Sequence, residues 1–546
     1  YNIKDVELVE RLEDKLKLIE LCLTMAYDAK VNYVDVFSPV KFWDTLIFNH
    51  LWKKQIVIPP KKVHKKPDQY AGGYVKDPQI GLHEWVVSFD LNSLYPHLIM
   101  QYNISPETII DRKNVDPELC GLTVNVDSLL NQELDLSPLK HDQWPSEPLT
   151  VTPNGQFFST KKQGFLPELM QKMYNDRVTY KKKLMESRQA LETEQNSDEK
   201  MRLKREVATY HNIQMAKKIA LNSAYGALGN EYFRYFDIRQ AEAVTLSGQL
   251  AIRWIEQAMN EWLIKLLQHR ADYVIAADTD SIYLNLKPLV EKSFKTPPTY
   301  EKAISFLDKV CQTKFEPFID NSYKQLAEYV NAFAQKMTMK REVIADKGIW
   351  TSKKRYILNV YDSEGLRYLE PQIKVMGIEA VKSSTPEICR SKIREALKLI
   401  MTKDEESVIE FIETFRQEFF QLPAEDISFP RSCNNLNRYV NQEKSIPIHV
   451  KGALVFNRLL KEKKLKKRYQ VIRQSDKIKF VYLKTPNTAQ SHVIALLSRL
   501  PREFKLDQYL DYETQFAKAF VDPLNLILQV IGWKTEQVGS LEGFFQ

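Results

Sequence analysis

The sequence predicts an α+β fold with several lobes, in which a long helical hairpin interrupts a sheet and a mostly helical region follows. Three observations support this prediction. A buried strand pattern at 84–89 leads into a helix, two long segments carry apolar residues at helical period, and the pattern beyond Pro386 is mostly helical. The 546 residues, 44% of them hydrophobic, exceed the roughly 250–300 residues that one core usually serves.

The N-terminal third begins with helical spacing over 3–30, and a basic, proline-rich stretch at 59–67 is typical of a linker. The strand at 84–89 feeds a tight turn and then a helix. We expect this helix to begin at Pro96, because proline is favoured at the first helical position.

The middle of the chain alternates charged and apolar residues at helical period over 167–188 and again over 199–224, with a polar break between them. This pattern predicts an antiparallel helical hairpin. A further helix is expected over 238–267. The segments 273–277 and 281–284 flank Asp278-Thr279-Asp280 as the two arms of a β-hairpin.

The composition indicates which classes of protein fit this chain. The net charge of +8 permits a polyanionic partner without requiring one. The five cysteines are far apart, which favours a reducing compartment over a disulfide framework or a zinc site. The sequence contains neither an apolar stretch near the ~20 residues that span a bilayer nor a signal peptide. Because the chain begins at Tyr1 inside a helical pattern, we expect further residues or a partner upstream.

Three carboxylates are the candidate catalytic groups. Asp90 ends the first predicted strand, and Asp278 and Asp280 lie at the tip of the predicted hairpin, so only the fold can bring them together. Phosphoryl transfer requires charge neutralisation and in-line positioning, which two Mg²⁺ ions held by few carboxylates can supply. On spacing alone, however, an Asp-Thr-Asp turn is equally well a solvated turn.

The segments 90–96 and 278–281 resemble the two acidic motifs of family B DNA polymerases, and 103–108 is similar to the replicative polymerases of tailed, myovirus-type bacteriophages. The resemblance implies a right-hand fold with an antiparallel palm sheet, helical-hairpin fingers and a mostly helical thumb. It also implies that Asp90, Asp280 and the backbone carbonyl of Leu91 hold two Mg²⁺ ions, with Asp278 as a supporting acid. Glu342 falls where the family has another acid, although Lys340 replaces an acid of the phage branch.

The expected division of the chain follows the same resemblance. The ranges are 1–60 for the C-terminal part of an exonuclease domain, 61–163 for the first part of the palm with a template-contact linker, 164–229 for the fingers, 230–379 for the second part of the palm, and 380–546 for the thumb with a clamp-binding tail.

The expected nucleotide pocket combines a helix N-terminus with a cationic helix face. The amides of Ser93, Leu94 and Tyr95 can bind phosphate oxygens, and the ring of Tyr95 resembles the family's steric gate against a 2′-hydroxyl, although an ordinary core tyrosine remains possible. The second hairpin helix resembles the family's Lys-x-x-x-Asn-Ser-x-Tyr-Gly motif. The remaining residues of the expected pocket are Arg177, Lys181, Lys218, Asn222, Tyr225 and Gly226. Arg177 and Lys181 are also compatible with a solvated basic face, and the 41 residues from Arg177 to Lys218 make a shorter hairpin than in phage relatives.

The resemblance also implies a set of DNA-binding residues. Segment 70–75 resembles the motif that touches the template backbone, and 353–356 resembles the motif that grips the primer. The expected contacts are Tyr70, Gly72, Gly73, Thr279, Lys353, Lys354, Arg355 and Tyr356. Ala276-Ala277 replaces the family's Tyr-Gly, which puts primer-end affinity in doubt. For the basic run at 461–468, duplex binding and plain solvation stay equally open.

The two ends of the chain suggest partners. Tyr1 and Asp5 resemble the last exonuclease motif without its partner carboxylates, so we expect no proofreading unless a separate exonuclease-domain chain supplies them. Leu541, Phe544 and Phe545 resemble a peptide that docks onto a sliding clamp, with a tail folded back on the thumb as the alternative.

The sequence therefore predicts a DNA-directed DNA polymerase that uses deoxynucleoside triphosphates, primer–template DNA and two Mg²⁺ ions in the cytoplasm of an infected bacterial host, without a membrane partner. A catalytically silent DNA-binding scaffold, a nuclease and an RNA-synthesising enzyme are the rival interpretations. The intact acidic set disfavours the first, the near-absence of an exonuclease domain the second, and Tyr95 the third.

Overall fold

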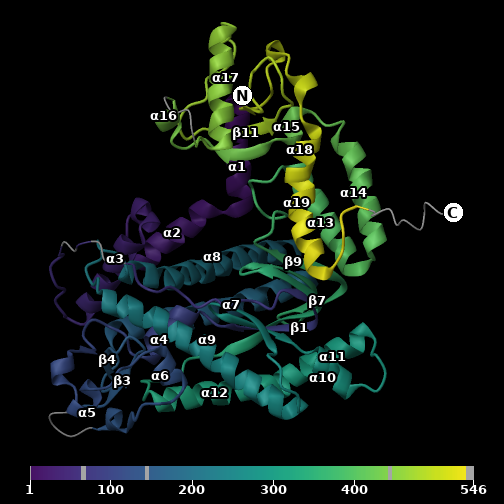
Figure 1. Cartoon of the computed structure of the whole chain (residues 1–546). Coiled ribbons are helices and arrows are strands. Elements are labelled where there is room, and N and C mark those ends of the chain that lie inside the picture. Colours follow the sequence, from purple (N-terminus) through teal and green to yellow (C-terminus); the bar gives the residue numbers. More distant parts are fainter. Residues whose placement is uncertain (1, 63–64, 66–68, 142–146, 441–444, 537–546) are drawn as a thin grey trace. The chain divides into compact units, whose positions relative to one another are not determined.

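The computed structural model describes residues 2–62, 65, 69–141, 147–440 and 445–536 (Figure 1). Two compact units share the chain. The first comprises residues 1–76, 88–283 and 306–342, and the second comprises 77–87, 284–305 and 343–546. Both contain helices, and antiparallel strand pairs recur, which confirms the α+β prediction in its coarse form.

The first unit begins with two helices in place of the single one expected over 3–30. Helix α1 spans Asn2–Leu16 and α2 spans Leu18–Ala29, because Lys17 adopts a left-handed conformation with φ of 52° and interrupts the helical backbone. Helix α3, Pro39–Lys53, follows, with proline at its start and the Ser38 hydroxyl accepting a hydrogen bond from the Lys41 amide.

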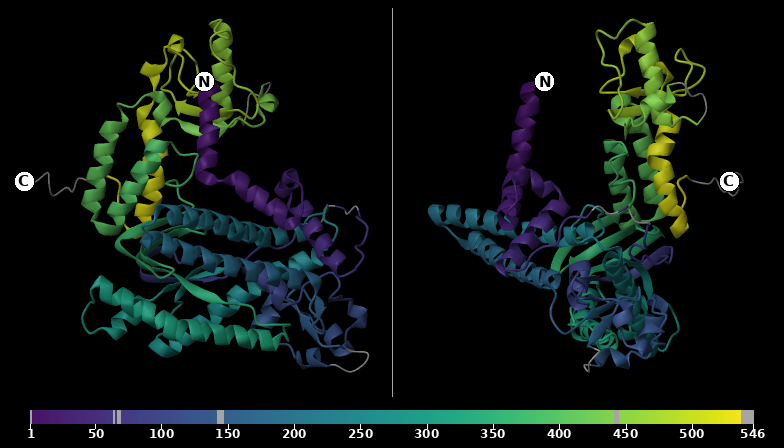
Figure 2. Two further views of the ribbon diagram at one scale, coloured as in Figure 1. Left: turned by 180° about the vertical axis from the view of Figure 1, so that it is seen from behind. Right: turned by 90° about the vertical axis from the view of Figure 1, so that its left-hand side faces the viewer.

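A helical hairpin forms the longest element of the first unit, as predicted. Helix α7 spans Phe165–Thr193 and α8 spans Ser197–Leu228, and the two run side by side in both views (Figure 2). The Asn196 side chain accepts hydrogen bonds from the Asp198 and Glu199 amides and so caps α8. Helix α9 spans Ile238–Leu267, the range predicted from its apolar period, and Asp237 caps it.

A six-stranded sheet has the order β5-β6-β1-β7-β8-β9. The strands are β1 (Gly81–Leu91), β5 (Val274–Asp278), β6 (Ser281–Asn285), β7 (Met339–Ser352), β8 (Arg355–Ser363) and β9 (Leu366–Met376). Strands β1, β5 and β6 confirm the predicted buried strand and hairpin. Helix α4, Leu94–Gln101, follows β1 and begins two residues before Pro96, so the expected start was slightly late.

Shorter strands and helices complete the first unit and make up residues 284–305 of the second unit. Strands β2 (Ile109–Ile110), β3 (Leu149–Val151) and β4 (Phe157–Ser159) form a small sheet in the order β2-β4-β3. The helices are α5 (Pro117–Cys120), α6 (Val126–Leu130), α10 (Lys287–Ser293), α11 (Tyr300–Val310) and α12 (Glu316–Tyr329).

The second unit pairs β7 with β8 and β8 with β9 in antiparallel register and continues into helices. These are α13 (Glu387–Thr402), α14 (Glu405–Phe419), α15 (Ala424–Ile427), α16 (Leu436–Tyr439), α17 (Ile448–Glu462), α18 (Tyr512–Phe516) and α19 (Asp522–Leu528). Their core includes the buried rings of Phe415, Phe419 and Phe516, with centroids 5.2–5.7 Å apart.

The region beyond Pro386 is mostly helical, as predicted, but it also contains a sheet that was not expected. Strands β10 (Phe429–Ser432), β11 (Lys477–Tyr482) and β12 (Val493–Leu496) pair in the order β10-β11-β12. Within the described ranges, no helix is both long enough and apolar enough to cross a membrane. In the part of the chain that the structure describes, none of the five cysteines forms a disulfide.

Candidate functional site

The candidate site starts in the first unit, where the end of one strand meets the beginning of another. Asp90 is the penultimate residue of β1, and Asp280 directly precedes β6. The Leu91 amide donates a hydrogen bond to the Asp280 carbonyl oxygen at 2.8 Å, and the Asp280 amide donates to the Asp278 carbonyl oxygen at 2.6 Å. The fold therefore brings the backbones of Asp90 and Asp280 side by side, with Asp278 in the same turn.

The turn between β5 and β6 is held in an unusual conformation. Thr279 has a φ of 59°, which is rare and strained for a β-branched residue. Its amide donates to the Tyr74 carbonyl oxygen at 2.9 Å, and its hydroxyl donates to Asp278 Oδ1 at 3.0 Å. Residue 75 also pairs with Asp278 in an antiparallel bridge. Segment 74–76 therefore fixes the turn that carries two of the three acids.

Glu342 lies near the same strand end. The Ser88 hydroxyl, two residues before Asp90 on β1, donates to Glu342 Oε2 at 3.2 Å. Lys340, which replaces a family acid, instead forms an ion pair with Glu316 at 2.7 Å. Among the described residues, no group of three or more His, Cys, Asp or Glu side chains is arranged to hold a metal ion. A site made of two carboxylates and a backbone carbonyl contains fewer than three such side chains, so it is compatible with this finding.

The N-terminus of α4 opens next to the acids. Ser93 precedes it in a left-handed conformation, with φ of 48° and ψ of 57°, and its side chain does not cap the helix. The first amides of a helix have no intrahelical acceptor, so those of Leu94 and Tyr95 are available to an anion. Nη1 of Arg177, on α7, donates to the Ser93 hydroxyl at 3.3 Å, which brings the hairpin to this helix terminus.

His97 is a residue that the sequence interpretation missed. Its Nδ1 lies 2.9 Å from the Ser93 carbonyl oxygen, and its ring packs edge-on against Tyr174 with a centroid distance of 4.5 Å. Burial, followed by the charges of Lys336 and Arg177, holds the pKa of His97 below its ordinary value. A neutral His97 therefore supports the strained Ser93 backbone, a role that no sequence spacing signals.

Three tyrosines from distant segments meet beside the acids. The rings of Tyr95 and Tyr225 have centroids 4.7 Å apart, and the hydroxyls of Tyr70 and Tyr225 are 2.9 Å apart. Burial raises the pKa of Tyr95, and the negative charge of Asp280 raises it further. Burial and the hydrogen bond with Tyr70 raise the pKa of Tyr225 strongly. The hydroxyls of Tyr95 and Tyr225 therefore stay protonated at neutral pH, and Asp280 is close enough to Tyr95 to affect its ionisation.

Gly73 lies in contact with this group. A Cβ atom at Gly73 would lie 3.0 Å from Thr279 Cγ2 and 3.4 Å from the Tyr95 hydroxyl, whereas a Cβ at Gly72 would have no heavy atom within 4 Å. The Gly72 carbonyl oxygen accepts a hydrogen bond from Gln249 Nε2 at 2.6 Å. The structure thus gathers the predicted residues Tyr70, Gly72 and Gly73 around the acids and Tyr95.

The predicted cationic residues lie on the hairpin with different exposures. Lys181, Lys218 and Asn222 are exposed, Arg177 is partly buried, and Gly226 is exposed with open space where a Cβ would point. Lys218 and Asn222 are one helical turn apart on α8. The hairpin therefore offers positive charge to solvent on the α8 surface that also carries Gly226.

The predicted primer-gripping residues belong to the second unit, at the turn between β7 and β8. Lys353 forms an ion pair with Asp77 at 2.9 Å, and Arg355 pairs with Glu379 through two bonds of 3.2 and 2.8 Å. The buried ring of Tyr356 stacks on Trp350 at 5.3 Å. Lys354 occupies the tip with a φ of 60°. Lys353 and Lys354 are the exposed members of this set.

The remaining predicted residues lie at the two ends of the chain and in the basic run. Asp5 is exposed on α1, while Tyr1, Leu541, Phe544 and Phe545 lie outside the described residues. The charged side chains of 461–468 are exposed, and Arg468 forms an ion pair with Glu503.

Comparison with known proteins gives consistent matches. The model of DNA polymerase family B matches residues 43–531. The DNA-directed DNA polymerases of Enterobacteria phage T4 and Escherichia phage RB69 are each 32% identical to this chain, over all of it and over 64% of their own length. The DNA polymerase of Pyrococcus glycovorans is 24% identical over 86% of this chain and 49% of its own length. The chain thus spans just under two thirds of the length of the two phage relatives.

Proposed function

Since this chain belongs to DNA polymerase family B, we propose that it is a DNA-directed DNA polymerase that adds deoxynucleotides to a primer 3′-end. The observation that carries this proposal is the pairing of the β1 end with the β5–β6 turn, which places Asp90 beside Asp280 and Tyr95 within the influence of the Asp280 charge. The names of both phage relatives support it.

We propose that Asp90, Asp280 and the Leu91 carbonyl hold two Mg²⁺ ions, with Asp278 in support. The donor set fits, because carboxylate and carbonyl oxygens are the ligands that this hard cation prefers. When bound, the ions neutralise phosphate charge and lower the pKa of the primer hydroxyl. The contribution of the chain is geometric: segment 74–76 and the Leu91–Asp280 hydrogen bond fix the acids before substrate arrives.

The nucleotide then lies between α4 and the hairpin in this proposal. The amides of Ser93, Leu94 and Tyr95 bind phosphate oxygens, and Arg177 reaches the same place because it contacts the Ser93 hydroxyl. Lys181, Lys218 and Asn222 complete the binding of the triphosphate. The ring of Tyr95 is held by Tyr225 and its hydroxyl lies close to Gly73, so it has little freedom to yield to a 2′-hydroxyl. Gly226 accommodates the base.

We assign Tyr70, Gly72 and Gly73 to contacts with the template and 353–356 to contacts with the primer, and we assign Thr279 to the DNA contacts without a choice of strand. Lys353 and Lys354 are exposed and can reach phosphates. Arg355 is hydrogen-bonded to Glu379, so it binds a phosphate only by breaking that pair or by contacting both groups at once. In this scheme 164–229 are the fingers, 61–163 and 230–379 the palm, and 380–546 the thumb.

We further propose that the chain replicates a phage genome in the host cytoplasm. Asp5 is an exposed surface acid. The partners that fit the sequence are a separate exonuclease-domain chain and a sliding clamp. The clamp would bind the tail residues Leu541, Phe544 and Phe545.

The test is extension of a labelled primer on a DNA template, with deoxy- or ribonucleotides and with Mg²⁺ or EDTA. We expect extension by the templated deoxynucleotide alone and only with Mg²⁺. A chain that binds primer–template yet never extends it, even with an added exonuclease-domain chain, would instead be a DNA-binding scaffold.

A further inference from the structure

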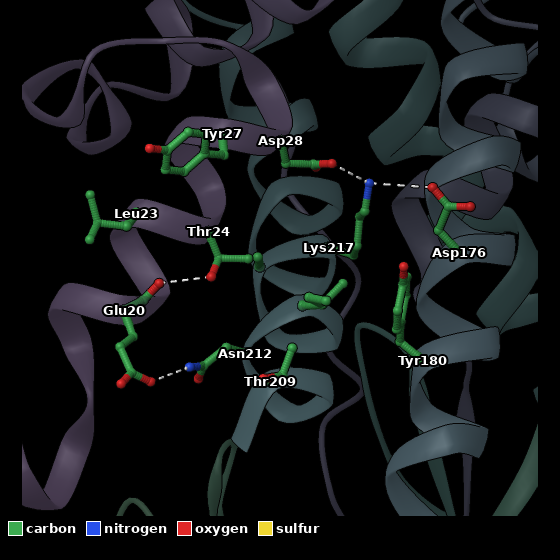
Figure 3. Close-up of a pocket in the computed structure, with 12 residues that line it drawn as sticks. Glu20, Leu23, Thr24, Tyr27, Asp28, Asp176, Tyr180, Thr209, Asn212 and Lys217 are labelled. Carbon is green, nitrogen blue, oxygen red and sulfur yellow. Dashed lines mark hydrogen bonds and ion pairs between the residues drawn. The ribbon is translucent and has the colours of Figure 1, made fainter. Parts of the chain in front are cut away.

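Helices α2, α7 and α8 surround a pocket of about 680 Å³ in the first unit (Figure 3). Its wall includes Tyr27 from α2, Tyr180 from α7 and Ile213 from α8. Lys217 lies at one side of this pocket with its side chain between two carboxylates, which belong to the two other helices. The sequence interpretation passed over Lys217 and named only its neighbour Lys218.

Lys217 joins three helices through one ammonium group. Its Nζ lies 2.7 Å from Asp28 Oδ1 on α2 and 3.3 Å from Asp176 Oδ2 on α7. Lys217 is only 8% exposed, so its charge has little access to water. A buried charge is stable only when it is paired, and this pairing holds the three helices in one arrangement.

The same ion pairs bear on the expected triphosphate site through neighbouring residues. Asp176 directly precedes Arg177 on α7, and Lys217 directly precedes Lys218 on α8. Consecutive residues of an α-helix are about 100° apart around its axis, so a fixed position for one determines the direction of the next. The bond between Asp176 and Lys217 therefore sets how α7 and α8 present Arg177 and Lys218.

Helix α2 adds a second attachment on the same side of α8. The side-chain Nδ2 of Asn212, more than one helical turn before Lys217, donates to Glu20 Oε2 at 3.0 Å. This bond links α2 to α8 only. Removal of this bond weakens the contact of α2 with α8 but leaves the ion pairs of Lys217 in place. It therefore supplies a matched control for the loss of those ion pairs.

We propose that Lys217 is a positioning residue that acts through Asp28 and Asp176 to hold Arg177 and Lys218 toward the triphosphate of the incoming nucleotide. This inference rests on the proposed polymerase function. Asp28 precedes residue 43, where the match to the family model begins, so the proposal extends the nucleotide site to a helix outside that match.

The experiment compares Lys217→Met with the wild type in single-nucleotide primer extension. Methionine keeps the apolar stem and removes the charge. We expect the KM for the deoxynucleotide to rise about tenfold and kcat to change less than about threefold, because the reacting acids are untouched. Lys217→Arg keeps the charge and should retain most of the affinity for the deoxynucleotide. If Lys217→Met fails to fold, Asp28→Asn changes a partly exposed partner of the same ion pair and should cause the same rise in KM.

Asn212→Ala is the control and should leave the KM within about twofold. An unchanged KM in Lys217→Met and Asp28→Asn, or an equal rise in Asn212→Ala, overturns the inference. Calorimetric binding of the deoxynucleotide to the chain on a dideoxy-terminated primer–template separates the two proposals. Binding that Lys217→Met weakens, without any extension by the wild type, retains the inference and removes the polymerase proposal. Absence of both binding and extension removes both.

Discussion

The contact between Gly73 and Thr279 allows a sharp test of how the acidic turn is held. In Gly73→Ala, the new Cβ would lie 3.0 Å from Thr279 Cγ2 and 3.1 Å from Thr279 Oγ1. Carbon atoms in ordinary contact are about 3.5–4.0 Å apart, so Thr279 must move by a few tenths of an ångström. Its hydroxyl is bonded to Asp278 and its amide to Tyr74, so the movement reaches the acids.

Overpacking of this kind costs about 1–3 kcal/mol, and about 1.4 kcal/mol corresponds to a tenfold change in rate. We therefore expect kcat/KM for deoxynucleotide addition by Gly73→Ala to fall by about tenfold or more. Gly72→Ala is the matched comparison at saturating primer–template, because no heavy atom lies within 4 Å of its new Cβ, and its kcat/KM should fall less than that of Gly73→Ala.

The second variant Thr279→Ser removes the methyl group that the new Cβ meets. It should recover part of the lost rate in the Gly73→Ala background, measured by single-turnover extension of a saturating primer–template. Equal rates for Gly72→Ala and Gly73→Ala would refute the argument. So would a loss in Gly73→Ala that Thr279→Ser leaves unchanged.

Tyr95→Ala should let the chain incorporate ribonucleotides, measured as the ratio of kcat/KM for deoxy- and ribonucleotides, and an unchanged ratio contradicts the gate. Tyr225→Phe removes the hydroxyl bonded to Tyr70 and should lower kcat/KM by about fivefold, with no further loss in the double variant Tyr70→Phe/Tyr225→Phe. Burial raises the pKa of the Asp346 carboxyl above its ordinary value of 3.8, because the charged form is poorly solvated. The free energy of unfolding therefore decreases as the pH rises from 3.8 through the folded-state pKa, where the buried carboxyl loses its proton. Asp346→Asn removes this buried charge, and its new amide can donate to Asn359 Oδ1, which is buried without a hydrogen-bond partner among the described residues. We expect Tm to rise by about 2–4 °C at pH 7.5 and by less at pH 4. A Tm shift at pH 7.5 that is negative, or no larger than the shift at pH 4, refutes this.

Long periodic segments and strong turn signals made much of the fold predictable. The hairpin of α7 and α8 has an unbroken helical period and an Asn196 cap, and α9 begins directly after its Asp237 cap. The strand before Asp90 was recognisable because its apolar run is short and ends in a turn. These features are local, so the sequence alone contains them.

The missed elements depend on distant contacts. Strands β2 and β10 are two and four residues long and are stabilised by partners elsewhere in the chain, so they carry little local pattern. The break at Lys17 occurs without glycine or proline, inside a segment whose helical period continues. Nothing in the local sequence indicates that this lysine leaves the helical conformation.

The candidate site shows the same division. The acids and the α8 face were recognised through motifs, but the hydrogen bond between Tyr70 and Tyr225 joins residues from separate segments and needs the fold. Lys217 in a Lys-Lys pair is typical of a solvated helix surface, and only the approach of Asp28 and Asp176 makes it a buried ion pair.

The central claim is that Asp280, beside Asp90, supports nucleotide addition rather than DNA binding. Single-turnover extension by Asp280→Asn, with primer–template affinity measured on the same sample, tests it most directly. Asp5→Asn provides the same chemical change at an exposed position on α1. The account predicts a rate lower by on the order of 100–1,000-fold for Asp280→Asn, with DNA affinity within about threefold and Asp5→Asn unchanged. A rate for Asp280→Asn within about tenfold of the wild type would contradict it.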